Sequence, residues 1–427
     1  MTVHIVPAMY QAIDPNHTPI SGGWFLVFTI LKMVVIFTVY MVGVAMLTFA
    51  ERKISAWIQD RHGPNRVWRG WGQPAADGLK NFMKEETMPA GVNKPLFVLA
   101  PIISFIPALT AWCVIPFGAP IATRWGRIDL VVADLPVGFL FILAISSLGV
   151  YGIVLAGWSS NNKYALLGGL RSSAQMVSYE ISLGMSTIPV LLLAGNVSLN
   201  SIINQQAWGG WNVVNLTVAF FIFMVAAFAE TNRLPFDLPE AESELIAGYH
   251  TEYSAMKFSL FFIAEYASMV TQSALMATLF FGGWDVPFTA RDNIGPYSGW
   301  ISLLSIGIFL VKILFFLFLF MWIRWTLPRF RYDQLMSLGW KFMLPLALVY
   351  IVLIAAVMLG LSAAGIGQGW MYAAILGSLN IALIIVLFAI LDRGRIISPA
   401  YGRMYPKEIA RLRALDRRPR VAAEAGR

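Results

Sequence analysis

Cysteine and charge are both scarce in this sequence, and each scarcity excludes a class of protein. Cys113 is the one cysteine among 427 residues, so the chain alone can form no disulfide framework, zinc ribbon or cysteine-ligated iron–sulfur cluster. Charged residues make up 13% of the chain and hydrophobic residues 58%, whereas soluble domains carry about 25% charged residues. A soluble domain could not bury this much apolar surface. The composition therefore predicts a polytopic membrane protein.

Histidine is scarce as well, and its distribution argues against a haem protein. His4 and His17 precede the first apolar segment, while His62 and His250 fall between apolar segments. No pair on facing helices could ligate a haem, which disfavours a cytochrome b. The sequence also has no glycine-rich nucleotide loop, no HExxH motif and no nucleic-acid-binding motif. Any redox centre is therefore expected in a partner or a diffusible ligand.

Nine apolar segments are long enough to cross a bilayer, which takes about 20 residues. We predict membrane helices at Trp24–Thr48, Leu96–Phe117, Asp134–Gly157, Ser173–Gly195, Asn212–Glu230, Ala255–Gly282, Gly299–Trp325, Trp340–Leu361 and Trp370–Leu391. No Lys or Arg precedes Lys32, so the first segment is predicted to be a retained anchor rather than a signal peptide.

The positive charges predict that the N-terminus lies outside and the C-terminus in the cytoplasm. With that orientation, 26 of the 31 Lys and Arg residues lie on the cytoplasmic side, as the positive-inside rule requires. The expected organisation is a periplasmic segment at 1–23, an eight-helix core at 24–361 with cytoplasmic loops at 49–95, 158–172 and 231–254, a ninth membrane helix at 362–391 and a basic tail at 392–427. The tail is expected to contact anionic lipid or a partner subunit.

The cytoplasmic loops are predicted to be structured. In the first loop, helical spacing indicates a short surface helix over Ile54–Arg61, and Ala75–Met83 is predicted as a second. In the third loop, Pro239 can open a helix on which Glu240 and Glu244 share a face. A solvated acidic loop is the alternative for this third segment.

Three carboxylates fall on three different predicted membrane helices, in the same half of the bilayer. These are Glu180, Glu230 and Glu265. An ionisable residue inside a membrane is a functional hypothesis by default, and burial with nearby cations lets such carboxyls exchange protons near neutral pH. Neutral acids that satisfy backbone groups are the alternative. Cations available as counter-charges are Lys312, Arg324 and Arg233, whereas Lys32 can instead extend to the outer interface.

Four blocks of sequence carry a resemblance to a known family. They are Glu51-Arg52-Lys53 with QDRHGPNRVW and QPAADGLKNFMKE; GWSSNNKYALLGGLRSSAQMVSYE; AETNRLPFDLPEAESELIAGYHTEYS with Glu265-Tyr266; and IRWTLPRFRYDQLM. In these blocks, which cover the chain from about Trp24 to Leu361, the sequence resembles the H subunits of bacterial NADH-quinone oxidoreductase. That family corresponds to mitochondrial NADH dehydrogenase subunit 1, a part of respiratory complex I.

The resemblance implies a fold of eight membrane helices, several strongly tilted, in the bacterial inner membrane beneath a quinone-reducing arm. It implies a core subunit of a proton-translocating enzyme whose substrate is ubiquinone or menaquinone, with FMN and iron–sulfur clusters held only by partner subunits. Residues matched to the quinone chamber are Glu51, Arg52, Asp77, Lys80, Glu85, Arg233 and Asp237. Residues matched to the proton path and its coupling loop are Glu180, Glu230, Glu265, Glu240, Glu242 and Glu244. The ninth helix and basic tail depart from the family pattern.

Three alternatives stay open at this point. A related subunit anchors membrane-bound hydrogenases, although the unbroken RLPFDLPEAESEL block favours the quinone enzyme. A stand-alone secondary transporter would show an internal repeat, and none is clear here. A passive anchor would not need the three intramembrane carboxylates.

Overall fold

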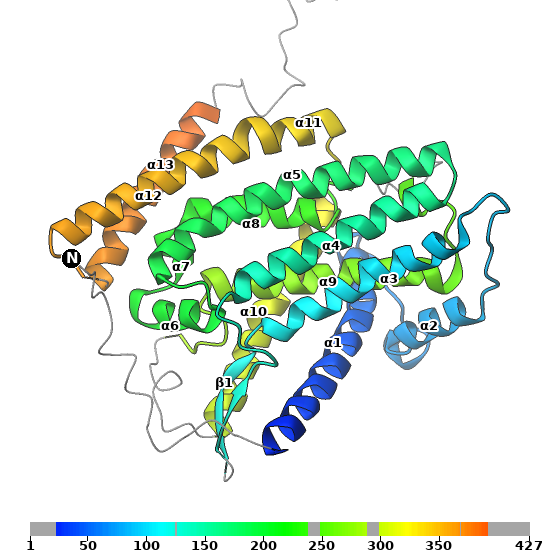
Figure 1. The fold of residues 1–427 in the computed structure, drawn as a ribbon, viewed down its shortest axis with the longest axis horizontal. Helices are drawn as coiled ribbons and strands as arrows, with labels where there is room; N and C mark the ends of the chain where they lie inside the picture. The colour runs from blue at the N-terminus through cyan, green and yellow to red at the C-terminus, as the bar shows by residue number, and fades with distance from the viewer. Residues whose placement is uncertain (1–22, 124–125, 238–247, 288–298, 368, 392–427) are drawn as a thin grey trace, which may run out of the picture. The chain divides into compact units, whose positions relative to one another are not determined.

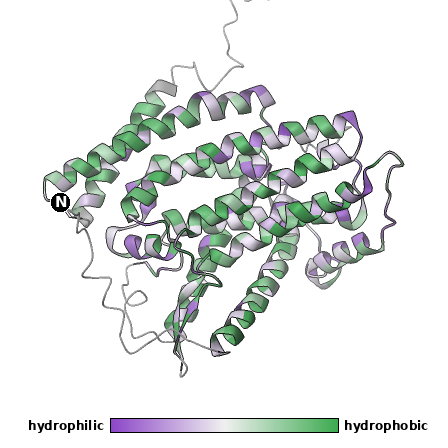
Figure 2. Ribbon diagram, viewed as in Figure 1, coloured by the Kyte–Doolittle hydropathy of each residue, from purple (hydrophilic) through white to green (hydrophobic). Residues whose placement is uncertain are grey.

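Long apolar segments form helices in this protein because a helix satisfies its own backbone N–H and C=O groups where water is absent. The computed structural model describes residues 23–123, 126–237, 248–287, 299–367 and 369–391 (Figure 1). Within these ranges, eight helices are long and apolar enough to cross a membrane: Gly23–Ile58, Lys94–Val114, Gly138–Ser159, Lys163–Ala194, Ala255–Phe280, Gly299–Thr326, Tyr332–Ala363 and Met371–Ala389. Figure 2 shows apolar residues along most of their length. The protein is therefore a multi-pass membrane protein, and most of its described residues are helical.

The elements follow one another in the following order. They are α1 (Gly23–Ile58), the 3-10 turn η1 (Trp68–Gly70), α2 (Gln73–Met83), α3 (Lys94–Thr110), the 3-10 turn η2 (Ala111–Val114), β1 (Gly118–Thr123), β2 (Gly126–Leu130), α4 (Gly138–Ser159), α5 (Lys163–Ala194), α6 (Leu199–Gly209), α7 (Asn212–Asn215), α8 (Thr217–Glu230), the 3-10 turn η3 (Gly248–His250), α9 (Ala255–Phe280), α10 (Gly299–Thr326), α11 (Tyr332–Ser337), the π-helical turn η4 (Leu338–Met343), α12 (Leu344–Ala363) and α13 (Trp370–Leu391).

Helix α9 lies at the centre of the packing. It contacts α3, α8, α10 and α1, while α4 packs between α3 and α5, and α5 packs on α8 (Figure 1). In the most apolar 18-residue stretch of α9, 72% of the residues are buried, whereas in that of α1 only 6% are. Polar residues on α9 therefore face other helices rather than lipid.

The chain divides into two compact units, residues 1–377 and 378–427. The helices from α1 to α12 belong to the first unit. In the second unit the structure describes Ser378–Leu391, which is the C-terminal part of α13. The helix expected at Trp370–Leu391 is thus present, and that it crosses the membrane stays a prediction.

The first membrane helix is longer than expected. The sequence predicted an end at Thr48 and a separate surface helix over Ile54–Arg61, but α1 continues without a break to Ile58. Glu51, Ser55 and Ala56 are buried on it, so packing continues past the point where the composition changes. No helix-breaking residue occurs before the His62-Gly-Pro-Asn turn. The second short helix is confirmed as α2.

The second of the loops predicted to be cytoplasmic is shorter than expected. Residues 158–172 were expected to form a loop, but α4 ends at Ser159 and α5 begins at Lys163. The side chain of Asn162 accepts a hydrogen bond from the backbone N–H of Tyr164, which caps the new helix. Glu180 therefore lies near the middle of α5 instead of close to its start.

The fifth predicted membrane segment, Asn212–Glu230, is broken into α7 and α8 at Leu216. The Nδ2 of Asn212 donates to the carbonyl of Leu279, and Asn215 Nδ2 donates to the carbonyl of Gly209. These side chains tie the first turn to its neighbours at the expense of a continuous helix. The 14 residues of α8 span only about 21 Å, less than the hydrocarbon core of a typical bilayer.

A two-stranded antiparallel hairpin, β1 with β2, was not expected in an all-α chain. It connects η2 to the segment before α4. The ammonium group of Lys32 on α1 donates to the carbonyls of Asp129 (3.1 Å) and Val131 (2.6 Å) beside it. Lys32 is therefore held by backbone carbonyls at the end of β2.

Candidate functional site

Charged side chains from three membrane helices and one loop meet in a buried group, which we call the charged cluster. It consists of Glu51 on α1, Arg233 after α8, Glu265 and Tyr266 on α9, and Arg324 on α10. Arg233 Nε lies 2.5 Å from Glu265 Oε1, and Arg233 Nη1 lies 3.3 Å from Glu51 Oε2. Arg324 Nη1 lies 2.5 Å from Glu51 Oε1, and the Tyr266 hydroxyl donates to Glu51 Oε2 at 2.6 Å.

The charges of the cluster are held in place by one another. Arg233 is only 3% exposed, and burial by itself would lower its pKa. The carboxylates of Glu265 and Glu51 reverse that effect and hold the pKa of Arg233 above its ordinary value. Its guanidinium also stacks 4.1 Å from the centre of the Tyr266 ring. A buried charge of this kind persists only with such partners.

A cavity of about 210 Å³ opens beside the cluster, and we call it the larger cavity. Its walls carry three arginines, Arg233, Arg324 and Arg329, together with Asp237 and Glu265. Arg329 Nη2 lies 3.2 Å from Asp237 Oδ2, which fixes the start of the acidic loop to the end of α10. The larger cavity thus has a cationic wall with charged hydrogen-bond donors.

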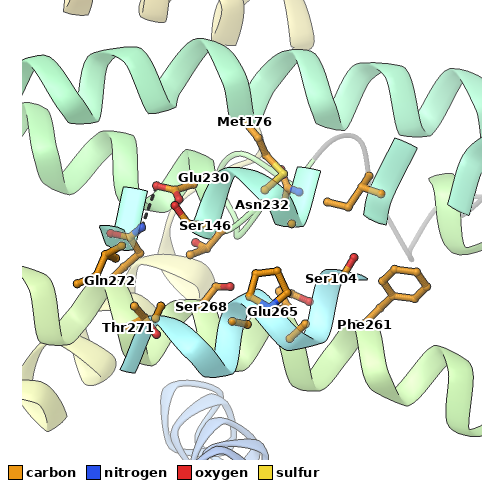
Figure 3. A pocket seen from close by; sticks show the side chains of 18 of the residues that line it. Ser104, Ser146, Met176, Glu230, Asn232, Phe261, Glu265, Ser268, Thr271 and Gln272 are labelled. Atoms are coloured by element: carbon orange, nitrogen blue, oxygen red, sulfur yellow. Dashed lines mark hydrogen bonds between the residues drawn. The ribbon is translucent and has the colours of Figure 1, made fainter. Parts of the chain in front are cut away.

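A second cavity of about 80 Å³, the smaller cavity, lies between α3, α4, α5 and α9. Its lining includes Glu265 and Glu230, together with the polar residues Ser146, Ser268 and Gln272 (Figure 3). Such a volume holds several water molecules. Both cavities are lined by Asn232, Tyr249, Phe261 and Glu265. Glu265 therefore borders both spaces.

A buried amide fixes the loop that separates the two cavities. Gln175 Nε2 on α5 donates to the carbonyls of Ala229 and Phe236, each at 2.9 Å, and to Asn232 Oδ1 at 3.0 Å. Asn232 Nδ2 in turn donates to Ser172 Oγ at 2.8 Å. These bonds hold residues 229–236 against α5, so that Arg233 enters the charged cluster from a defined backbone.

Of the three predicted proton-path carboxylates, Glu230 interacts with or lies near each of the other two. Glu265 and Glu230 share the smaller cavity. Glu180 lies on α5, half-buried, and interacts electrostatically with Glu230 across the α5–α8 contact. The structure therefore places them in the order Glu265, Glu230, Glu180.

The residues matched to the chamber are only partly brought together. Glu51 and Arg233 are in the charged cluster, and Asp237 lines the larger cavity. Arg52 pairs with Asp77 on α2 at 2.8 Å, while Lys80 and Glu85 are exposed. Glu240, Glu242 and Glu244 lie outside the described residues.

The proposed counter-charges are partly wrong. Arg233 pairs with Glu265 as expected, but Arg324 pairs with Glu51. Lys312 donates instead to the carbonyls of Phe281, Gly283 and Asp285, at 2.8, 2.8 and 2.9 Å. Its charge therefore caps the C-terminal end of α9.

Sequence reasoning overlooked Tyr266, Gln175 and Gln272. Tyr266 and Gln175 fall within or beside blocks already quoted, one residue after Glu265 and five before Glu180. Gln272 had a detectable signal, because it lies seven residues after Glu265 and therefore on the same helix face. Within the described ranges, no group of His, Cys, Asp or Glu side chains is placed to hold a metal ion.

Comparison with known proteins gives consistent matches. The sequence model of the NADH dehydrogenase family matches residues 31–355. The NADH-quinone oxidoreductase H subunit of Leptospira biflexa is 52% identical over 338 residues, which cover 77% of this chain and 93% of that protein. The corresponding protein of Rhodospirillum rubrum is 49% identical over 337 residues, covering 78% and 95%. The family match includes the charged cluster and both cavities and ends before α13.

Proposed function

The chain belongs to the NADH dehydrogenase family, together with the H subunits of NADH-quinone oxidoreductase, and on that premise we propose that its two cavities couple quinone reduction to proton pumping. One observation carries the proposal. Glu265 borders both cavities and is ion-paired within the charged cluster. A change of charge in the larger cavity therefore acts on a group that also faces Glu230.

The larger cavity would form the base of the quinone chamber. Reduction of a quinone to a quinol takes two electrons and two protons, and negative charge develops on the head before the protons arrive. The cationic wall of Arg233, Arg324 and Arg329 would stabilise that charge. An arginine drawn toward the head would loosen its hold on Glu265 or Glu51. The quinone tail would enter through an apolar opening near α1 and α9.

The smaller cavity would then carry the proton into the membrane arm. Glu265, once weakened in its pairing with Arg233, takes up a proton and passes it through the cavity to Glu230 and onward to Glu180. Each transfer moves one proton between carboxyl oxygens, by way of water or hydroxyl groups. The acidic loop with Glu240, Glu242 and Glu244 would respond to the same charge.

The redox cofactors would belong to partners. FMN and iron–sulfur clusters are assigned to the peripheral quinone-reducing subunits, because a single Cys113 cannot supply a cluster's ligands. The site of action would be the bacterial inner membrane, with anionic lipid around the basic tail. The hydrogenase-anchor alternative is less well supported, since the relatives are named for the quinone enzyme.

The test is to replace Glu265 or Glu230 with Gln in the assembled enzyme. We expect normal co-purification of the other subunits, with coupled quinone reduction lowered about tenfold or more because a proton carrier is lost. Proton pumping is followed in sealed vesicles with NADH as donor. Asp333→Asn, which neutralises an exposed carboxyl on α11, is the matched control and should pump normally. Full pumping by both Gln variants would disprove the path.

A further inference from the structure

Gln272 on α9 makes a direct hydrogen bond to the carboxyl of Glu230, to which Ser146 on α4 also bonds. Its Nε2 donates to Glu230 Oε2 at 2.8 Å (Figure 3). The side chain is buried, with 4% of its surface exposed, and it lines the smaller cavity. Nothing in the sequence-based proton path requires an amide at this position.

The position of Gln272 on α9 is set by the helix period. Glu265, Ser268 and Gln272 are separated by three and four residues and all line the smaller cavity. The face that presents Glu265 at one end of the cavity therefore presents Gln272 at the other. Glu230 enters from the last residue of α8 and meets the amide there.

We infer that Gln272 is a positioning residue for Glu230: its amide N–H fixes the carboxyl at the smaller cavity and favours the ionised form that can accept a proton from Glu265. The inference rests on the proposed function, because it assumes that Glu230 receives this proton. It adds to that path an uncharged hydrogen-bond donor, which holds the carboxyl of Glu230 in place before the proton arrives.

The physical reason lies in what an amide can donate. A hydrogen bond from N–H to a carboxylate is charge-assisted and stronger than the bonds the neutral acid can form. Its loss changes the ratio of ionised to protonated carboxyl by about tenfold or more. The amide oxygen of Gln272 has no hydrogen-bond partner among the described residues. The contact with Glu230 is therefore the one that orients the amide.

The amide itself neither gains nor loses a proton during the transfer. When the proton leaves Glu265 and arrives at Glu230, the charge-assisted bond weakens and the carboxyl is released from its fixed position. Glu230 is then free to pass the proton toward Glu180. Gln272 would thus favour release of the proton from Glu230 toward Glu180, because its N–H binds the ionised carboxylate more strongly than the neutral acid.

The test replaces Gln272 with Met, which keeps the length of the side chain and removes the amide. The intact enzyme is reconstituted into vesicles, and two quantities are measured. One is the number of protons pumped per NADH oxidised at neutral pH. The other is the pH at which the infrared C=O stretching band of the protonated Glu230 carboxyl, assigned by its loss in Glu230→Gln, reaches half of its full height. We expect the ratio to fall at least twofold and the midpoint of the acid band to rise by about one pH unit or more, which corresponds to the tenfold change in the ratio of ionised to protonated carboxyl.

Ser273→Ala is the control, since it removes the buried hydroxyl next to Gln272 on α9, and Ser273 is not among the residues that line either cavity. That hydroxyl donates to the carbonyl of Met269 at 2.8 Å, so this variant should keep both the ratio and the band. An unchanged midpoint of the acid band in Gln272→Met would overturn the inference, as would equal losses in Gln272→Met and Ser273→Ala. If Glu230→Gln itself pumps normally, the proposed function fails, whereas normal behaviour of Gln272→Met alone removes only the positioning role.

Discussion

Buried ionisable side chains in this protein each have a specific set of partners. Lys32 and Lys312 are held by backbone carbonyls, whereas Glu51 and Glu265 are held by arginines. A backbone carbonyl does not gain or lose charge. The carboxylates pair with arginines that also line a cavity, so their pairing can respond to what binds there.

His250 differs from these charged side chains, because its buried imidazole ring is neutral near pH 7. It is 6% exposed and packs against the rings of Tyr249 and Phe258, at 5.0 and 5.4 Å between ring centres. Burial lowers the pKa of His250 from 6.5 to about 4. The unfolded chain therefore binds a proton at higher pH than the folded protein does.

Stability should accordingly decrease in mild acid because of His250. The titration of His250 leaves the free energy of unfolding unchanged above about pH 6.5. It lowers this free energy as the pH decreases from 6.5 toward 4, by about 3 kcal/mol in total, and has no further effect below pH 4. Thermal denaturation of the purified enzyme, followed at this subunit between pH 7 and 4.5, measures the effect. His250→Gln should reduce the slope over that range. An identical slope in the variant would contradict the assignment.

At the scale of elements, close approach of α5 to η3 places the loop beside the cavities. A Cβ atom on Gly168 would lie 2.7 Å from Gly248 Cα and 2.8 Å from Tyr249 N, both backbone atoms. Backbone cannot move aside as a flexible side chain can. Gly168 therefore sets the distance between α5 and the segment that carries Tyr249 and His250.

Gly168→Ala should push η3 away from α5 and widen the boundary between the two cavities. We expect a loss of stability of about 1–3 kcal/mol, as for other overpacked sites, with a lower proton-to-electron ratio. Gly184→Ala on the same helix is the control, because its Cβ would meet nothing closer than 3.9 Å. Thermal stability and pumping of both variants are compared in one preparation. Equal behaviour of the two would show that the close approach is unimportant.

At the scale of the whole molecule, the distribution of positive charge predicts how the chain is oriented. Ten Lys and Arg residues fall at 393–427, beyond α13, against Glu408, Asp416 and Glu424. Moving this tail across a membrane would be unfavourable. The tail follows α13 directly. The side of the membrane on which the tail lies therefore shows whether the whole chain crosses the membrane an odd or an even number of times.

Single cysteines test this orientation. With Cys113 replaced by Ala, Met404→Cys should react with a membrane-impermeant maleimide in inverted vesicles but not in intact spheroplasts. Thr2→Cys should show the reverse pattern. Labelling of both positions from the same side would exclude an odd number of crossings, so that either α13 or the short helix α8 would not span the membrane.

The sequence by itself determined the class of protein, the approximate positions of eight long helices and the carboxylates that were candidates for function. Two of those helices, α1 and α5, are each ten residues longer at one end than predicted. Apolar length and charge are local properties, and they decide whether a segment enters a membrane. The family blocks also identified Glu51, Arg233 and Glu265 as functional candidates.

Tertiary structure alone decided which charges meet and where helices continue or break. Glu51 and Arg233 are separated by 182 residues along the chain, and no local pattern specifies that they pair or that Arg324 joins them. The extension of α1 past Glu51 and the break at Leu216 depend on partners supplied by other helices. In the membrane interior a polar group must find its partner within the protein, so the three-dimensional packing, rather than the residue type, brings Glu265 and Glu230 to the same cavity.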